Sequence, residues 1–196
     1  MTQLIATATP PEPRRRWTTA EFRGLVDAGH LRDGSGTFLW DGEMIEPMPK
    51  KRPHINTERA LLDILNGRFP NDRWTVDFDS PLELRDGFEP QPDIMVLRGP
   101  RASYIDHVPT PADVALLVEV SSTTYSFDSG EYLQGYARVG IAAYWIVNIK
   151  ERRIEVYFDP DADRATYRTR QDYGPGMQVP LEGGQVAVDE VFRFTP

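Results

Sequence analysis

Two acidic residues placed beside apolar, β-prone runs constrain this chain more than any other feature. Asp93 precedes the run 94–97, and Glu119 stands near the end of the run 114–120. An ionised carboxylate in such surroundings loses hydration unless a cation or hydrogen-bond donors compensate for it. If the two runs form neighbouring strands, both side chains can converge and hold one divalent metal ion through oxygen ligands. Taken singly, Asp93 also suits a turn or capping residue, and Glu119 also suits a strand end that faces solvent.

Length and composition predict one domain of ordinary size. The chain has 196 residues, of which 40% are hydrophobic and 27% charged. This composition is typical of a globular protein that buries its apolar surface without disulfides or structural metals. Residues 1–16 are rich in Thr, Ala and Pro and end in arginines. We therefore expect a flexible arm over 1–16, followed by a single domain over 17–196.

The chain contains no cysteine, which excludes disulfides and thiolate metal sites. No apolar run approaches the roughly 20 residues that span a bilayer. The first residues also lack the basic start and long apolar core of a secretory signal. These features predict a cytoplasmic protein with no membrane partner.

Hydrophobic periodicity predicts an α/β protein of the mixed α+β kind, in which most strands follow an early helix. The turn signal Asp41-Gly42 predicts a hairpin over 37–48. Helices are expected at 18–29, 53–69 and 128–140, the last capped by Asp128 and ended by Gly140. The expected strands lie at 74–78, 82–84, 94–97, 113–120, 144–147, 153–158, 165–173 and 186–188, with a loop at 100–111. The aromatic residues Tyr136, Tyr144 and Trp145 are expected in the core.

The charge balance opposes binding of nucleic acid, because phosphate contacts draw affinity from lysine and arginine and the formal net charge is −8. Two basic runs are local exceptions. One is 14–16, and the other is Lys50-Lys51-Arg52, just before the helix 53–69. Lys50, Lys51 and Arg52, with His54 at the start of the helix, are therefore candidate nucleic-acid contacts. A solvated loop is the alternative reading.

The sequence around the two acids follows a family pattern. It is carried by Pro92-Asp93, by Ser121-Ser122-Thr123-Thr124-Tyr125-Ser126-Phe127-Asp128 after Glu119, by the stretch 136–147, and by Trp40-Asp41-Gly42-Glu43-Met44. In combination these segments resemble the Uma-two family of candidate restriction endonucleases, a branch of the PD-(D/E)XK nuclease superfamily. The resemblance runs from about residue 17 to about residue 157. It implies a central mixed sheet flanked by helices, here with an extra N-terminal helix and β hairpin, and hydrolysis of DNA with Mg²⁺ or Mn²⁺.

The resemblance also implies roles for particular residues. Asp93 and Glu119, with the backbone carbonyl of Val120, would be the ligands of the metal ion. Many nucleases of the superfamily present a glutamate from the first core helix toward the metal. Glu58 stands in a suitable position for this, one helical turn from His54. An exposed helical glutamate is the alternative for Glu58.

One expected group is missing. Nucleases of the superfamily add a lysine two residues after the strand acid, where this chain has Ser121, or on the next helix, where it has Tyr132. Three readings remain open. Gln134, Lys50 or Lys51 substitutes for the lysine; or the protein binds metal and nucleic acid but cleaves slowly or not at all; or the site is degenerate. Loss of such a cation costs about 10²-fold or more in rate.

Three functions follow as hypotheses. The first is a Mg²⁺-dependent endonuclease acting on DNA. The second is a catalytically inactive nucleic-acid-binding or regulatory module that keeps the nuclease fold. The third is a homodimeric structural partner without a nucleic-acid role, which the acidic net charge favours. Other enzyme classes lack support, because the chain has no dinucleotide, P-loop, zinc-protease or α/β-hydrolase motif.

Overall fold

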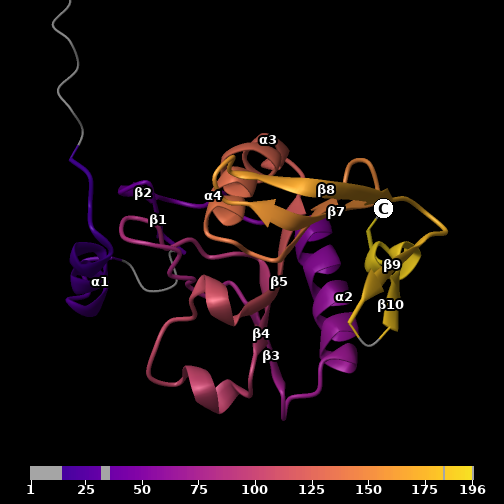
Figure 1. The fold of residues 1–196 in the computed structure, drawn as a ribbon, viewed down its shortest axis with the longest axis horizontal. Coiled ribbons are helices and arrows are strands. Elements are labelled where there is room, and N and C mark those ends of the chain that lie inside the picture. The colour runs from indigo at the N-terminus through magenta and orange to yellow at the C-terminus, as the bar shows by residue number, and fades with distance from the viewer. Residues whose placement is uncertain (1–14, 32–35, 183, 196) are drawn as a thin grey trace, which may run out of the picture.

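A six-stranded mixed sheet forms the centre of the protein in the computed structural model, which describes residues 15–31, 36–182 and 184–195. Every neighbouring pair in the sheet is antiparallel except β5 and β6, which run parallel (Figure 1). The strand order is β3 (Trp74–Phe78), β4 (Ile94–Arg98), β5 (Val114–Ser121), β6 (Ala143–Asn148), β7 (Arg153–Asp161) and β8 (Thr166–Tyr173). The mixed fold that we expected is confirmed.

Each face of the sheet has its own apolar core, because alternate side chains of a strand point to opposite faces. Ile94 of β4 packs in one core with Leu61 and Leu65 of helix α2 (Arg52–Arg68). Met95 packs in the other core with Tyr136 of helix α4 (Leu133–Arg138). Tyr136, Tyr144 and Trp145 are all buried, as predicted. The sheet is thus covered by α2 on one face and by α4 on the other.

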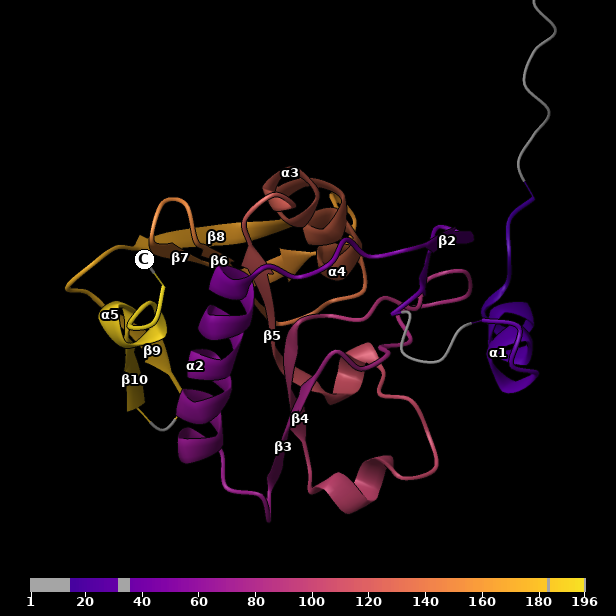
Figure 2. The ribbon, with the colours of Figure 1, turned by 180° about the vertical axis from the view of Figure 1, so that it is seen from behind.

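The parallel pair β5–β6 requires the chain to cross over between the two strands. The crossover consists of a short helix α3 (Tyr125–Phe127), a π-helical turn (Asp128–Tyr132) and α4. The three pieces follow one another as a coiled segment above the sheet (Figure 2). A π turn inside a helix often marks a functional position, and this one begins at Asp128, directly after α3.

The N-terminal elements lie at one side of the sheet. Helix α1 (Thr19–Asp27) begins with a capping box between Thr18 and Glu21. The expected hairpin is formed by β1 (Phe38–Trp40) and β2 (Glu43–Ile45), and both turn residues have positive φ, as the turn type requires.

Most of the arm expected over 1–16 lies outside the described residues, and its boundary at residue 16 stays a prediction. Arg15 and Arg16 are not part of a free segment, since Arg15 pairs with Glu21 and Arg16 with Asp41. The next residue donates its N–H to the carbonyl of Gly42. Arg16 and Trp17 therefore contact the hairpin turn, and Arg15 contacts α1.

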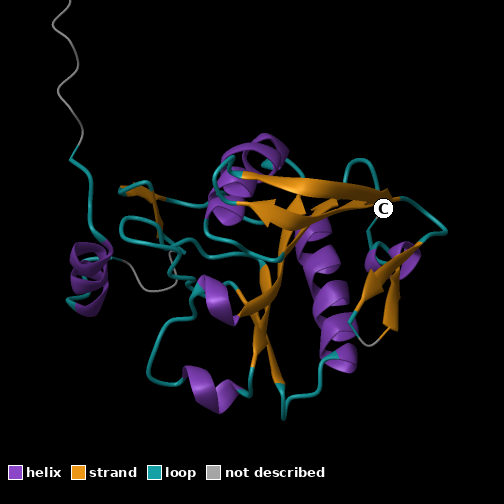
Figure 3. Ribbon diagram, viewed as in Figure 1, coloured by secondary structure: helices purple, strands orange, loops and turns teal. Residues whose placement is uncertain are grey.

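The C-terminal elements form a small unit beside α2 (Figure 3). Strands β9 (Gln178–Leu181) and β10 (Gly184–Ala187) pair antiparallel, and helix α5 (Val188–Val191) follows. The strand expected at 186–188 thus ends earlier, because Val188 begins a helix, and β9 was not predicted. The loop expected at 100–111 contains 3₁₀ turns at Arg101–Tyr104 and Pro111–Asp113.

Two other predictions were wrong. No strand forms over 82–84, although Leu82 and Leu84 are buried. The N–H groups of these leucines bond to the nearby carbonyls of Pro90 and Phe88, so the segment closes on itself. The helix predicted to begin at Asp128 begins three residues earlier, at Tyr125, so that Asp128 is not its cap.

Gly135 brings α4 against the hairpin, and its replacement tests this contact. A Cβ atom at Gly135 would lie 2.5 Å from Cη2 and 2.9 Å from Cζ2 of Trp40. The Trp40 ring is enclosed by Phe88, Tyr132 and Tyr136 and has little room to move. Overpacking costs about 1–3 kcal/mol, against a helix-propensity gain of about 1 kcal/mol for alanine. We expect Gly135→Ala to lower the free energy of unfolding in urea by about 1–2 kcal/mol.

The matched control is Gly67→Ala in α2, where an added Cβ atom meets nothing within 4 Å. Only the propensity gain applies there, and we expect unchanged or slightly higher stability. Equal stability of the two variants would show that Trp40 does not press on Gly135.

Candidate active site

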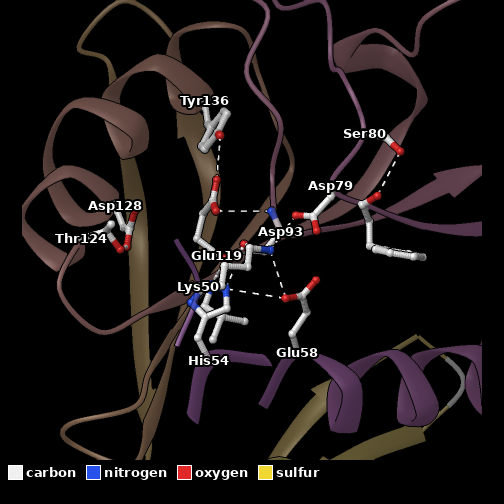
Figure 4. A network of polar contacts seen from close by, with 12 residues as sticks. Lys50, His54, Glu58, Asp79, Ser80, Asp93, Glu119, Thr124, Asp128 and Tyr136 are labelled. Atoms are coloured by element: carbon white, nitrogen blue, oxygen red, sulfur yellow. Dashed lines mark hydrogen bonds and ion pairs between the residues drawn. The ribbon is translucent and has the colours of Figure 1, made fainter. Parts of the chain in front are cut away.

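Asp93 and Glu119 are neighbours across two central strands (Figure 4). Strands β4 and β5 are antiparallel with Ile94 opposite Val118, so the start of β4 meets the end of β5. The N–H of Val120 donates to Asp93 Oδ2 at 2.7 Å, and the N–H of Asp93 approaches Glu119 Oε2 at 3.4 Å. Both carboxylates are buried. The meeting of the two acids that the sequence suggested is therefore present.

The first turns of α2 add an imidazole and a third carboxylate. Pro53 stands in the first turn, where its missing N–H costs nothing, and His54 and Glu58 then share one face of the helix. His54 Nε2 lies 3.1 Å from Asp93 Oδ1 and 3.7 Å from Glu58 Oε2. Glu58 is buried rather than exposed, which corrects the structural alternative considered above. Burial raises the pKa of the Glu58 carboxyl.

These groups fit a metal ion by their chemistry and spacing. One ligand atom from each of His54, Glu58 and Asp93 lies within 4.8 Å of the others. Carboxylate oxygens suit Mg²⁺ and Mn²⁺, and an imidazole nitrogen suits a transition metal. In the structure a cation already contacts the same oxygens, namely the ammonium group of Lys50. The set can therefore accommodate positive charge.

Lys50 lies at the centre of three acids, which we call the carboxylate cluster: Glu58, Asp79 and Asp93. Its Nζ atom lies 3.0 Å from Glu58 Oε2, 2.6 Å from Asp79 Oδ1 and 2.8 Å from Asp93 Oδ1. Burial lowers the pKa of Lys50, but the charge of Asp93 and the hydrogen bond to Asp79 outweigh burial and raise it above the ordinary value. Lys50 is therefore fully charged at neutral pH.

The pKa of Asp93 moves in the direction that keeps it ionised. Burial raises this pKa, but His54 and Lys50 together lower it below the ordinary value. Asp93 therefore stays ionised at neutral pH. Asp79 completes the cluster from the residue after β3, with a positive φ of 48° that aspartate tolerates better than most residues.

Glu119 points away from this cluster. Its Oε1 atom accepts a hydrogen bond of 2.9 Å from the hydroxyl of Tyr136 on α4. Burial and the charges of Asp93 and Asp128 raise the pKa of Glu119 well above its ordinary value. Val120 contacts Asp93 through its N–H group. The ligand roles expected for Glu119 and for the Val120 carbonyl stay predictions.

Asp128, which the sequence suggested only as a helix cap, is a buried acid near the site. Its carboxylate accepts a hydrogen bond of 2.7 Å from the hydroxyl of Thr124. Burial raises the pKa of Asp128 to about 6, and the charge of Asp93 contributes. Its proximity to the other acids arises from the early start of α3, which the sequence pattern did not indicate.

Tyr132, at the position where the family carries a lysine, is packed among other aromatic rings. The ring of Tyr132 lies 4.5 Å from that of Trp40, and the rings of Phe38, Phe127 and Tyr136 also surround it. Gln134, named above as a substitute, is exposed on α4. In the part of the chain that the structure describes, no hydrogen bond joins Gln134 to either strand acid. Neither residue brings a cation to the acids.

The three basic residues before α2 divide into two kinds. Lys51 and Arg52 are exposed at the start of the helix, where phosphate contacts remain a prediction. Lys50 points inward to the carboxylate cluster instead, and its expected phosphate contact stays a prediction. No local pattern indicates these ion pairs, because the partners of Lys50 lie 8, 29 and 43 residues away along the chain.

A groove of about 860 Å³ opens beside the cluster. Its lining includes Lys50, Asp79 and Asp93, as well as Phe22 of α1 and Met48 of the segment between β2 and α2. The acids are therefore reachable from outside the protein.

Comparison with models of known protein families shows which family this chain belongs to. The model of the Uma2 family, described as "Putative restriction endonuclease", matches residues 32–187. The chain belongs to the Uma2 family. The family resemblance seen in the motifs is therefore confirmed.

The fold of this Uma2 protein is also found in a solved structure. The chain is similar to the crystal structure of "a putative nuclease belonging to DUF820" from Anabaena variabilis, with a TM-score of 0.69 and 16% sequence identity. The match covers 91% of this chain and 99% of that chain. At this identity the likeness supports the fold alone. A comparison with curated proteins found no match. Among the described residues no helix is long and apolar enough to cross a membrane.

Proposed function

We propose that this Uma2 protein is a metal-dependent nuclease that hydrolyses phosphodiester bonds in DNA. The observation that carries the proposal is the convergence of His54, Glu58 and Asp93 at the junction of β4, β5 and α2, where a positive charge is already held. Membership of a family described as "Putative restriction endonuclease" supports the same reaction class. A single chain supplies all three groups, so the proposed site needs no second subunit.

Asp93, Glu58 and His54 would hold the divalent ion, with Glu119 beside them. When bound, the ion would neutralise charge on the phosphate and activate a water molecule for attack. The nitrogen of His54 favours Mn²⁺ over Mg²⁺, because Mg²⁺ prefers an all-oxygen set.

The protein groups have separable tasks in this scheme. The N–H of Val120 fixes the Asp93 carboxylate, and His54 holds its second oxygen. Lys51 and Arg52 lie exposed beside the site and would bind flanking phosphates of the DNA. Lys50 contacts the three acids of the carboxylate cluster and offsets part of their charge.

The second candidate is a nucleic-acid-binding module that has lost catalysis. The observation that favours it is the packing of Tyr132, which places an aromatic ring where the family carries a lysine. Such a module would retain metal and DNA but would cleave poorly. The two candidates differ in rate and not in binding.

The deciding experiment uses supercoiled and linear DNA with Mg²⁺, Mn²⁺ or EDTA. We expect weak cleavage that requires the metal ion and is stronger with Mn²⁺. We expect Tyr132→Lys to raise the rate, by up to about 10²-fold, because it restores a charge near the acids. Gln134→Lys adds the same charge at an exposed position of the same helix and should leave the rate unchanged. Cleavage that persists in EDTA, or that survives Asp93→Ala and Glu119→Ala together, would overturn the proposed site.

A further inference from the structure

The oxygen atoms that face a metal ion in the proposed site are already in use. Asp93 Oδ1 is shared by Lys50 Nζ at 2.8 Å and His54 Nε2 at 3.1 Å. Glu58 Oε2 is shared by Lys50 Nζ at 3.0 Å and His54 Nε2 at 3.7 Å. The ammonium group therefore occupies the same side of both carboxylates as the imidazole. An ion bound by His54, Glu58 and Asp93 would need these same oxygens.

Two cations cannot share this position. Mg²⁺ and Mn²⁺ bind carboxylate oxygens at about 2.0–2.2 Å, well inside the distances that Lys50 now keeps. Placing a divalent ion between Asp93 and Glu58 would bring it into direct contact with the ammonium group. At such separations the repulsion between like charges is several kcal/mol even at an effective dielectric constant of about 20. Entry of the metal therefore requires Lys50 to leave.

The segment that carries Lys50 can leave. Residues 46–50 connect β2 to α2 without regular structure, and the four residues 46–49 are exposed. Met48, for example, retains 64% of its exposure. The same segment borders the groove beside the site through Pro47, Met48 and Pro49. A displaced Lys50 side chain can thus turn into the groove without unfolding a helix or strand.

We propose that Lys50 is a tethered cation that competes with the divalent metal ion for the carboxylate cluster. In the metal-free protein Lys50 occupies the cluster and offsets part of its negative charge. Metal loading expels Lys50 into the groove and moves the segment 46–50 that forms part of the groove wall. This inference rests on the proposed metal site and adds to it a control of metal occupancy.

Binding of Mn²⁺ alone, measured by the loss of its free electron paramagnetic resonance signal, tests the competition without any substrate. If Lys50 occupies the site for more than nine-tenths of the time, its removal raises the apparent affinity at least about tenfold. We expect this gain in Lys50→Gln. Lys150→Gln, which makes the same charge change at an exposed turn residue, should bind Mn²⁺ like the parent.

Displacement can also be observed in the unaltered chain. The protein has only three lysines, so labelling of lysine with ¹³C and ¹⁵N gives three side-chain signals, which the glutamine variants assign. Added Mg²⁺ should shift the Nζ and Cε signals of Lys50 and leave those of Lys150 in place. This measurement holds even if Lys50→Gln folds poorly.

The outcomes separate this inference from the proposed function. The competition would be overturned if the parent and Lys50→Gln bound Mn²⁺ with equal affinity. It would also be overturned if saturating Mg²⁺ did not shift the Lys50 signals. Either result would leave the metal site intact. Absence of Mn²⁺ binding in both proteins would overturn the metal site and the competition together. Tighter binding in Lys50→Gln with a parent that cleaves no DNA would support the competition and contradict the nuclease.

Discussion

Asp93→Asn is expected to lower metal-dependent cleavage of DNA by at least about 10²-fold, the cost of removing a positioned electrostatic group from an active site. The substitution is nearly isosteric, and the amide oxygen can still accept the hydrogen bond from the Val120 N–H. It removes the one carboxylate that contacts Lys50, His54 and β5 at once. The measurement is the initial rate of plasmid relaxation at saturating Mn²⁺, together with Mn²⁺ affinity.

Asp63→Asn is the control for this variant. Asp63 lies on the exposed side of α2 and pairs only at the surface with Arg193, so its loss makes the same charge change away from the site. We expect parental cleavage from Asp63→Asn. A parental rate in Asp93→Asn would mean that the reaction centre lies elsewhere.

The metal-free protein is expected to lose stability as the pH rises from about 4 to about 6, through Asp128. The pKa of Asp128 rises from 3.8 to about 6 on folding, because burial penalises its charged form. A raised pKa in the folded state stabilises the protein below the ordinary pKa, and this contribution is lost as the pH rises through the folded value. Two pKa units correspond to about 3 kcal/mol.

Urea unfolding in EDTA at several pH values measures this effect as the difference between the parent and Asp128→Asn. The difference separates the contribution of Asp128 from that of Asp93, which is present in both proteins. Asp93 acts in the opposite direction, because its pKa is lowered and its contribution is lost as the pH falls. We expect Asp128→Asn to gain relative stability above pH 6. Parallel stability curves for the two proteins between pH 4 and 7 would contradict the assignment.

The meeting of Asp93 and Glu119 could be predicted because it depends on local patterns. Each acid borders a run of β-branched and aliphatic residues long enough to specify a strand, and neighbouring strands of opposite direction bring a start and an end together. The helix that carries His54 and Glu58 was also predicted from a local pattern, because its apolar residues recur at helical spacing. In these places local propensity and the final fold agree.

The position of Lys50 among the three acids could not be predicted, because it depends on segments that lack a periodic pattern of apolar residues. Lys50 lies in an irregular connection, and Asp79 follows a strand in a backbone conformation set by its tertiary surroundings. The strand predicted over 82–84 was wrong for a related reason, since the two leucines beside Pro81 specify burial but not strand pairing. Asp128 was predicted as a cap at the start of a helix. The helix begins earlier, at Tyr125, and Asp128 is buried.

The end of the chain lies close to the helix turn that carries the proposed ligands. The carbonyl of Phe194 accepts a hydrogen bond from Asn56, and the hydroxyl of Thr195 bonds to that of Thr57. Both partners stand between His54 and Glu58 in sequence. A histidine tag attached to the segment after Thr195 would begin near these side chains and would compete for divalent ions. Purification handles for this protein therefore belong at the opposite terminus or must be removed before metals are titrated.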